Sequence, residues 1–89
     1  MIVSISKISI RQIKAARSLL GWSQDDLAEK SGVSKPTIGR LESQGGETVG
    51  GREETGAALV AALEKAGVEF IAENGGGAGV RLAKRAKRK

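Results

Sequence analysis

The 89-residue sequence contains no cysteine, histidine or tyrosine, and it has one tryptophan, one phenylalanine and one proline. Without cysteine, disulfides and thiolate metal sites are excluded. Without histidine as well, the chain lacks the usual near-neutral acid–base group, the thiol nucleophile and the common zinc ligands, so we expect no enzyme and no cofactor. The scarcity of aromatic residues predicts one small domain with a core of Ile, Leu, Val and Ala.

Long apolar runs are also missing. No run approaches membrane-spanning length, and the first ten residues, MIVSISKISI, are too short and too rich in serine for the apolar core of a signal peptide. We therefore expect a cytoplasmic protein with no membrane partner, and no small-molecule substrate is evident. Paired acids such as Asp25 and Asp26 fall at the starts of predicted helices, where carboxylates favour the positive end of the helix dipole.

The positive charge is spread unevenly along the chain. The formal net charge is +5, and residues 81–89 hold six of the fifteen basic residues and no acid. A second basic group lies within the first 22 residues: Lys7, Arg11, Lys14 and Arg17. This asymmetry predicts a polyanionic partner, although the basic tail could instead simply keep the protein soluble.

Capping residues mark the helices of the first half of the chain. Ser9 can cap a helix that runs through about Leu20. Ser23 and Asp26 have the spacing of a capping box at the start of a second helix, over 24–30. Two helices are therefore expected within the first 30 residues.

A tight turn and a third helix follow. Gly32 can adopt the positive φ that a sharp helix exit requires, and Ser34 can cap a helix over about 35–43. Pro36 is acceptable in its first turn, where no backbone donor is committed. The glycine-rich stretch 44–52 is expected to be a loop, either a plain connector or a mobile segment that closes over a bound ligand.

A fourth helix should begin at 52 or 53 and end at Gly67, with an apolar stripe formed by Ala58, Leu59, Ala62, Leu63 and Ala66. Residues 68–72 and 80–83 then predict two strands of a hairpin around a glycine-rich turn. A lone two-stranded hairpin is marginally stable, and its edge can pair with a second copy, so we expect a homodimer.

Residues 24–42 contain the most informative pattern, QDDLAEKSGVSKPTIGRLE, in which small, apolar and turn residues stand where two short helices cross tightly. The pattern resembles the Cro and phage-repressor type of helix-turn-helix, the XRE family of bacterial DNA-binding regulators. Residues 11–24 look like that family's first helix and its link to the second, and residues 55–70 look like its last helix. The resemblance implies an all-α domain of four to five helices, here with a short C-terminal β-hairpin.

The domain organisation expected from these features has four parts. Residues 1–8 form an N-terminal extension that could add a strand, and residues 9–67 form the helix-turn-helix domain. The hairpin spans 68–83 and serves dimerisation, and the basic tail spans 84–89.

By this resemblance, the third helix enters the major groove of double-stranded DNA. The candidates for contact with base edges are Lys35, Pro36, Thr37, Gly39 and Arg40. Arg40 is the strongest, because a guanidinium can donate two bonds to guanine O6 and N7, although it could also be a solvated surface residue. Pro36 and Gly39 have no side-chain donor, so we expect sparse reading of sequence, with Gly39 permitting close approach of the backbone.

The resemblance also implies contacts to the DNA backbone and one internal ion pair. The phosphate candidates are Gln24, Ser34, Ser43, Gln44 and Lys14, with helix capping as the alternative role of Gln24. Arg17 and Glu42 match an ion pair that joins the first helix to the third. Trp22, in the link before the second helix, is interpreted as a core residue rather than a base-stacking one.

These inferences lead to a sequence-specific transcriptional regulator, a repressor that binds DNA as a homodimer. One alternative is an antitoxin that binds a partner toxin and also controls its own operon. The other is an architectural binder that grips DNA through the tail with weak sequence preference.

Overall fold

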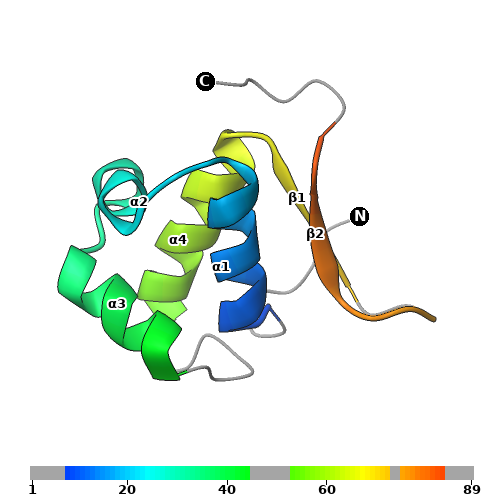
Figure 1. The fold of residues 1–89 in the computed structure, drawn as a ribbon, viewed down its shortest axis with the longest axis horizontal. Helices are drawn as coiled ribbons and strands as arrows, with labels where there is room; N and C mark the ends of the chain where they lie inside the picture. The colour runs from blue at the N-terminus through cyan, green and yellow to red at the C-terminus, as the bar shows by residue number, and fades with distance from the viewer. Residues whose placement is uncertain (1–7, 45–52, 73–74, 84–89) are drawn as a thin grey trace.

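The computed structural model describes residues 8–44, 53–72 and 75–83, and within them four helices are followed by one antiparallel hairpin (Figure 1). The elements are α1 (Ile10–Leu19), α2 (Gln24–Ser31), α3 (Lys35–Gln44), α4 (Glu53–Lys65), β1 (Val68–Ile71) and β2 (Gly79–Leu82). This arrangement confirms the expected mostly helical fold with a C-terminal hairpin. The expected N-terminal strand, most of the glycine-rich loop and the basic tail lie outside the described residues.

Reciprocal capping boxes begin both α1 and α2. At α2, the Ser23 hydroxyl accepts from the Asp26 N–H at 3.0 Å and the Asp26 carboxylate accepts from the Ser23 N–H at 2.9 Å, as predicted. At α1, Ser9 caps as predicted, but its partner is the side chain of Gln12, which the sequence interpretation did not anticipate. Each box satisfies two backbone donors that the helix itself leaves unpaired.

The turn between α2 and α3 has the predicted chemistry. Gly32 adopts φ +81°, a left-handed conformation that is costly for a residue with a Cβ. The Ser34 hydroxyl accepts from the Thr37 N–H at 3.4 Å, and the Ser34 carbonyl accepts from the Ile38 N–H at 3.1 Å. Ser34 therefore caps α3, which continues one residue beyond the predicted end, to Gln44.

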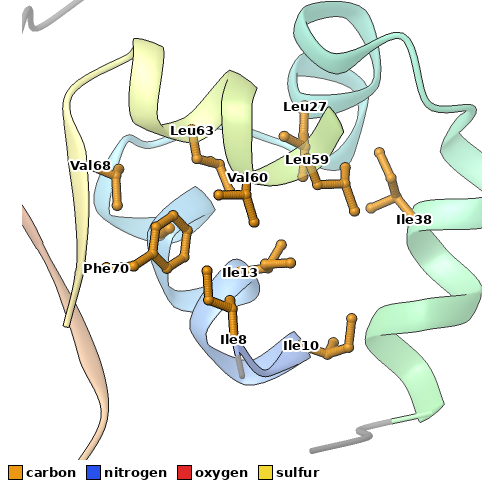
Figure 2. Packing of buried hydrophobic residues seen from close by; sticks show 11 residues of the cluster. Ile8, Ile10, Ile13, Leu27, Ile38, Leu59, Val60, Leu63, Val68 and Phe70 are labelled. Carbon is orange, nitrogen blue, oxygen red and sulfur yellow. The ribbon is translucent and has the colours of Figure 1, made fainter. Parts of the chain in front are cut away.

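One apolar core joins the helices to the hairpin (Figure 2). Ile38 of α3 points toward Leu27 and Leu59, while Phe70 of β1 closes the opposite end of the core. The buried apolar residues are Ile8, Ile10, Ile13, Ala16, Leu27, Ile38, Leu59, Val60, Leu63, Val68 and Phe70. Aliphatic side chains thus dominate the interior, and the fully buried Ile8 precedes the first helix.

The buried face of α4 is broader than the predicted stripe. Leu59 and Leu63 are buried as expected, whereas Ala58, Ala62 and Ala66 are only partly buried. Val60, outside the predicted stripe, is buried because α4 packs against α1, α2 and β1 at once. The helix ends at Lys65 rather than at the predicted Gly67, which adopts φ +108° in the following turn.

The hairpin buries one face and exposes the other. Val68 pairs with Leu82 and Phe70 with Val80 on the core side, and Glu69 pairs with Arg81 on the outer side. β1 begins at the predicted Val68 and ends one residue early, so Ala72 lies outside it. β2 is displaced by one residue from the prediction, so it includes Gly79 and excludes Ala83. Gly79 belongs to the strand because it pairs with Ile71.

The buried Gln12 fastens this hairpin to α1. Its side-chain amide donates to the carbonyl of Gly79 at 3.0 Å and to that of Ile71 at 3.4 Å, while its oxygen completes the Ser9 capping box. One side chain therefore stabilises the start of α1 and the position of the hairpin. In Figure 1 the hairpin lies beyond α1 and α4, on the side of the molecule away from α3.

Candidate nucleic-acid interface

Helix α3 presents one face to the core and the opposite face to solvent. Ile38 and Glu42 are buried and Leu41 is partly buried. Among the predicted base-edge residues, Lys35, Pro36 and Arg40 are exposed, whereas Thr37 and Gly39 are half-buried. The structure therefore brings all five candidates onto one short helix whose apolar side is fixed to the core.

Lys35 lies against the start of α2. Its Nζ is 3.3 Å from Oδ1 of Asp25, and the two side chains are 54% and 71% exposed. An ion pair this exposed contributes only about 0–1 kcal/mol, so Lys35 can exchange Asp25 for another anion at little cost. The sequence interpretation gave Asp25 only a role at the helix dipole, because the pairing depends on how α2 and α3 cross.

Hydroxyl groups around α3 already form hydrogen bonds within the protein. The Ser34 hydroxyl donates to Oγ1 of Thr37 at 2.9 Å, and the Ser43 hydroxyl donates to the Arg40 carbonyl at 3.0 Å. A hydroxyl has one proton to donate, and a phosphate oxygen can only accept. Thr37 therefore retains its donor, whereas Ser34 and Ser43 would have to rotate before donating to a phosphate.

Arg17 and Glu42 form the ion pair that the sequence led us to expect. Nε of Arg17 donates to Oε2 of Glu42 and Nη2 donates to Oε1, both at 2.9 Å, in a two-point contact. The third nitrogen of Arg17, Nη1, donates to the carbonyl of Trp22 at 2.9 Å. The guanidinium thereby connects α1, the link before α2, and α3.

Gln24 is the third member of this network. Its Nε2 donates to Oε1 of Glu42 at 2.9 Å, a contact that joins the first residue of α2 to the last turn of α3. Its expected alternative role was helix capping, but Ser23 fills that role. Nothing in the sequence pattern signalled the contact, since 18 residues separate the two side chains.

The environment of Glu42 favours its ionised form. Burial is the largest single influence and would by itself raise the pKa of Glu42, yet the hydrogen bonds from Arg17 and Gln24 and the nearby positive charges of Arg17 and Lys14 outweigh it. The pKa is therefore held below its ordinary value.

The remaining candidates occupy the borders of this surface. Gln44, the last residue of α3, is exposed, and Gln24 is half-buried. Trp22 packs partly buried against the core, in agreement with its structural interpretation. The described residues contain no cluster of three or more acidic side chains suited to a metal ion, and none of their helices is long and apolar enough to cross a membrane.

Comparison with known proteins agrees with this geometry. Residues 13–47, which include most of α1 and all of α2 and α3, match the family model described as "Helix-turn-helix". No curated protein matches the chain. The match and the fold support a DNA-binding transcriptional regulator in general, because the matching model describes DNA-binding rather than enzymatic domains. The matched region is similar to the Cro and phage-repressor type of helix-turn-helix, the XRE family.

Proposed function

We propose that this protein is a sequence-specific repressor that binds duplex DNA as a homodimer, with α3 in the major groove. The observation that carries the proposal is the exposed face of α3, where Lys35, Thr37 and Arg40 offer donors on a helix held in place by the buried Glu42. A major groove admits one α-helix, and sequence is read there by the few side chains that reach base edges.

Arg40 is the principal base-reading residue in this proposal. It is exposed and forms no ion pair with another described residue, so its guanidinium can turn to guanine O6 and N7. Lys35 supplies a second positive donor once it leaves Asp25, and Thr37 supplies a hydroxyl. Pro36 and Gly39 have no side-chain donor and can contribute only the shape of the helix surface. Few bases are therefore read directly by hydrogen bonds.

Contacts to phosphates orient α3 in the groove. Gln24 is hydrogen-bonded to Glu42 of α3, Lys14 is an exposed residue of α1, and Ser34, Ser43 and Gln44 lie at the two ends of α3. Phosphate contacts of this kind set register and orientation and carry no sequence information directly. The five basic residues of the tail, 84–89, would add salt-dependent affinity of the same general kind.

The hairpin provides the dimer contact. A two-stranded sheet leaves two unpaired backbone edges, and β1–β2 lies on the side of the molecule away from α3, where a second copy would not compete with DNA. Symmetric pairing of two chains predicts a palindromic site with half-sites about 34 Å apart, one helical turn.

We place this regulator in the cytoplasm, with no membrane partner.

Selection of binding sites from a random duplex pool, at about 150 mM salt to weaken nonspecific attraction, tests the proposal. Enrichment of a palindrome supports a dimeric repressor and supplies its operator. Failure to enrich any sequence would contradict specific reading by α3 and leave the architectural or antitoxin alternatives. Removing residues 84–89 separates these outcomes further, since it should abolish binding by an architectural protein but only reduce the affinity of a specific one.

A further inference from the structure

The amide of Gln24 has a single chemically permitted orientation in its site. Its neighbour is a carboxylate oxygen of Glu42, 2.9 Å away, and an ionised carboxylate accepts hydrogen bonds only. The nitrogen must therefore face Glu42, which resolves the usual ambiguity between amide nitrogen and oxygen. The amide oxygen then lies over α3, 3.5 Å from the position that a Cβ on Gly39 would occupy.

Glu42 is rigidly held on the core side of this contact. Its side chain is 5% exposed, and its two oxygens together accept three hydrogen bonds, two from Arg17 and one from Gln24. Arg17 is itself fixed to the Trp22 carbonyl. Gln24, half-buried at the start of α2, is thus attached to a fixed point of the interior.

The surface of α3 leaves space for Gln24. A methyl group on residue 39 would reach the amide oxygen at ordinary van der Waals distance, whereas a longer side chain would meet it directly. Gly39 therefore leaves room on α3 for the side chain of Gln24 from α2. The recognition surface around this position is formed by Gln24 and Gly39 together.

We infer that Glu42 is a positioning residue for DNA recognition: it holds the Gln24 amide over Gly39, so that one N–H of Nε2 binds Glu42 and the other remains for a phosphate oxygen. This inference rests on the proposed function and adds a role for Glu42 beyond its ion pair with Arg17. An amide nitrogen has two donors, so the bond to Glu42 and a bond to DNA are compatible. Because the amide is neutral, its loss weakens binding without changing the dependence of affinity on salt.

A double-mutant cycle tests the inference. Affinity of the full chain for a ~30-base-pair duplex, carrying the enriched site or a mixed sequence if none is enriched, is measured for wild type, Gln24→Ala, Glu42→Gln and the double variant. Circular dichroism verifies that each is folded at the assay temperature. We expect each single substitution to weaken binding about 2- to 10-fold, the range of one hydrogen bond. The loss caused by Glu42→Gln should be smaller once Gln24 is absent, because its effect through Arg17 remains and its effect through Gln24 does not.

Two outcomes would overturn the inference: an unchanged affinity for Gln24→Ala, or an equal loss from Glu42→Gln in both backgrounds. Glu64→Gln on α4 is the matched control, since Glu64 is exposed and remote from the network. Failure of the proposed function is distinguishable, because wild type would then enrich no site in the selection.

A second measurement needs neither DNA nor a Glu42 variant. The side-chain amide signal of Gln24, identified in NMR spectra by its loss in Gln24→Ala, should shift as Glu42 is protonated by acid before the chain unfolds. A signal that stays at the position of a free amide at every pH would also overturn the inference.

Discussion

Arg17 of α1 donates to both carboxylate oxygens of Glu42 of α3 at 2.9 Å, across 25 residues of sequence. The side chains are 15% and 5% exposed, so the pair is largely withdrawn from water. A buried pair of this geometry is costly to break, because removal of one partner leaves the other charge uncompensated. It therefore fixes the angle at which α3 leaves the core.

Glu42→Ala should destabilise the protein by about 3–5 kcal/mol, the cost of stranding a buried charge. Urea unfolding followed by circular dichroism gives the free energy directly. Glu29→Ala, at an exposed position of α2 beyond its first turn, is the comparison, expected within about 0.5 kcal/mol of wild type. Equal unfolding midpoints for the two variants would show that the pair contributes nothing.

The same pair predicts a loss of stability in acid. The pKa of Glu42 is lowered in the folded protein, so the unfolded chain binds the proton more readily. The ionised Glu42 contributes its full stabilisation above the pKa that it has in the unfolded chain, about 4.3. This contribution is lost as the pH falls from that value through the lower pKa of Glu42 in the folded protein. The difference in unfolding free energy between wild type and Glu42→Gln should therefore narrow steadily below about pH 4.3. A difference that stays constant to pH 2 would be inconsistent with this ionisation.

Gln12 has an equally specific role on the other side of α1. Gln12→Ala removes the bonds to the Gly79 and Ile71 carbonyls and half of the Ser9 capping box, so we expect a loss of about 1–2 kcal/mol. Hydrogen exchange should speed up in β1 and β2 more than in α3. The exposed Gln44 gives the matched Gln→Ala control. Uniform acceleration throughout the chain would mean that Gln12 stabilises the domain as a whole and does not specifically hold the hairpin.

The contrast between Glu42 and Gln12 shows what a sequence can and cannot predict. Helix starts at Ser9, Ser23 and Ser34 follow from local chemistry, and the resemblance to a known family indicated the Arg17–Glu42 pair. Gln12 meets the hairpin carbonyls across 59 and 67 residues, and no local pattern carries that information.

The contacts between α2 and α3 also could not be predicted from local sequence patterns. Asp25 reaches Lys35, and Gln24 reaches Glu42, only because α2 crosses α3 at a particular angle. A short-range reading of the sequence assigned Asp25 to a helix dipole and Gln24 to a phosphate or a cap. Tertiary packing adds partners that helical periodicity does not contain.

Gly39 tests the relation between stability and binding. Gly39 does not have a positive φ, and the atom near which a Cβ would lie, outside its own helix backbone and among the described residues, is Oε1 of Gln24 at 3.5 Å. Gly39→Ala should therefore stabilise the protein by up to about 1 kcal/mol, because alanine is the better helix former. If Gly39 serves close approach to DNA, the same variant should bind the selected site more weakly. A more stable variant that binds as tightly as wild type would rule out that role.

Arg40 and Lys14 should differ in the kind of affinity they supply. Arg40→Ala should cost about 1–3 kcal/mol on the selected site and relax the preference at one base pair in each half-site, because a bidentate guanine contact is lost. Lys14→Ala should weaken binding equally on all sequences and reduce the salt slope by about 1, because a phosphate contact releases a counterion. Affinities on matched and single-mismatch duplexes, each at several salt concentrations, separate the two effects. If Arg40→Ala changes only the salt slope, then Arg40 binds the DNA backbone, and base reading must be assigned to Lys35 and Thr37.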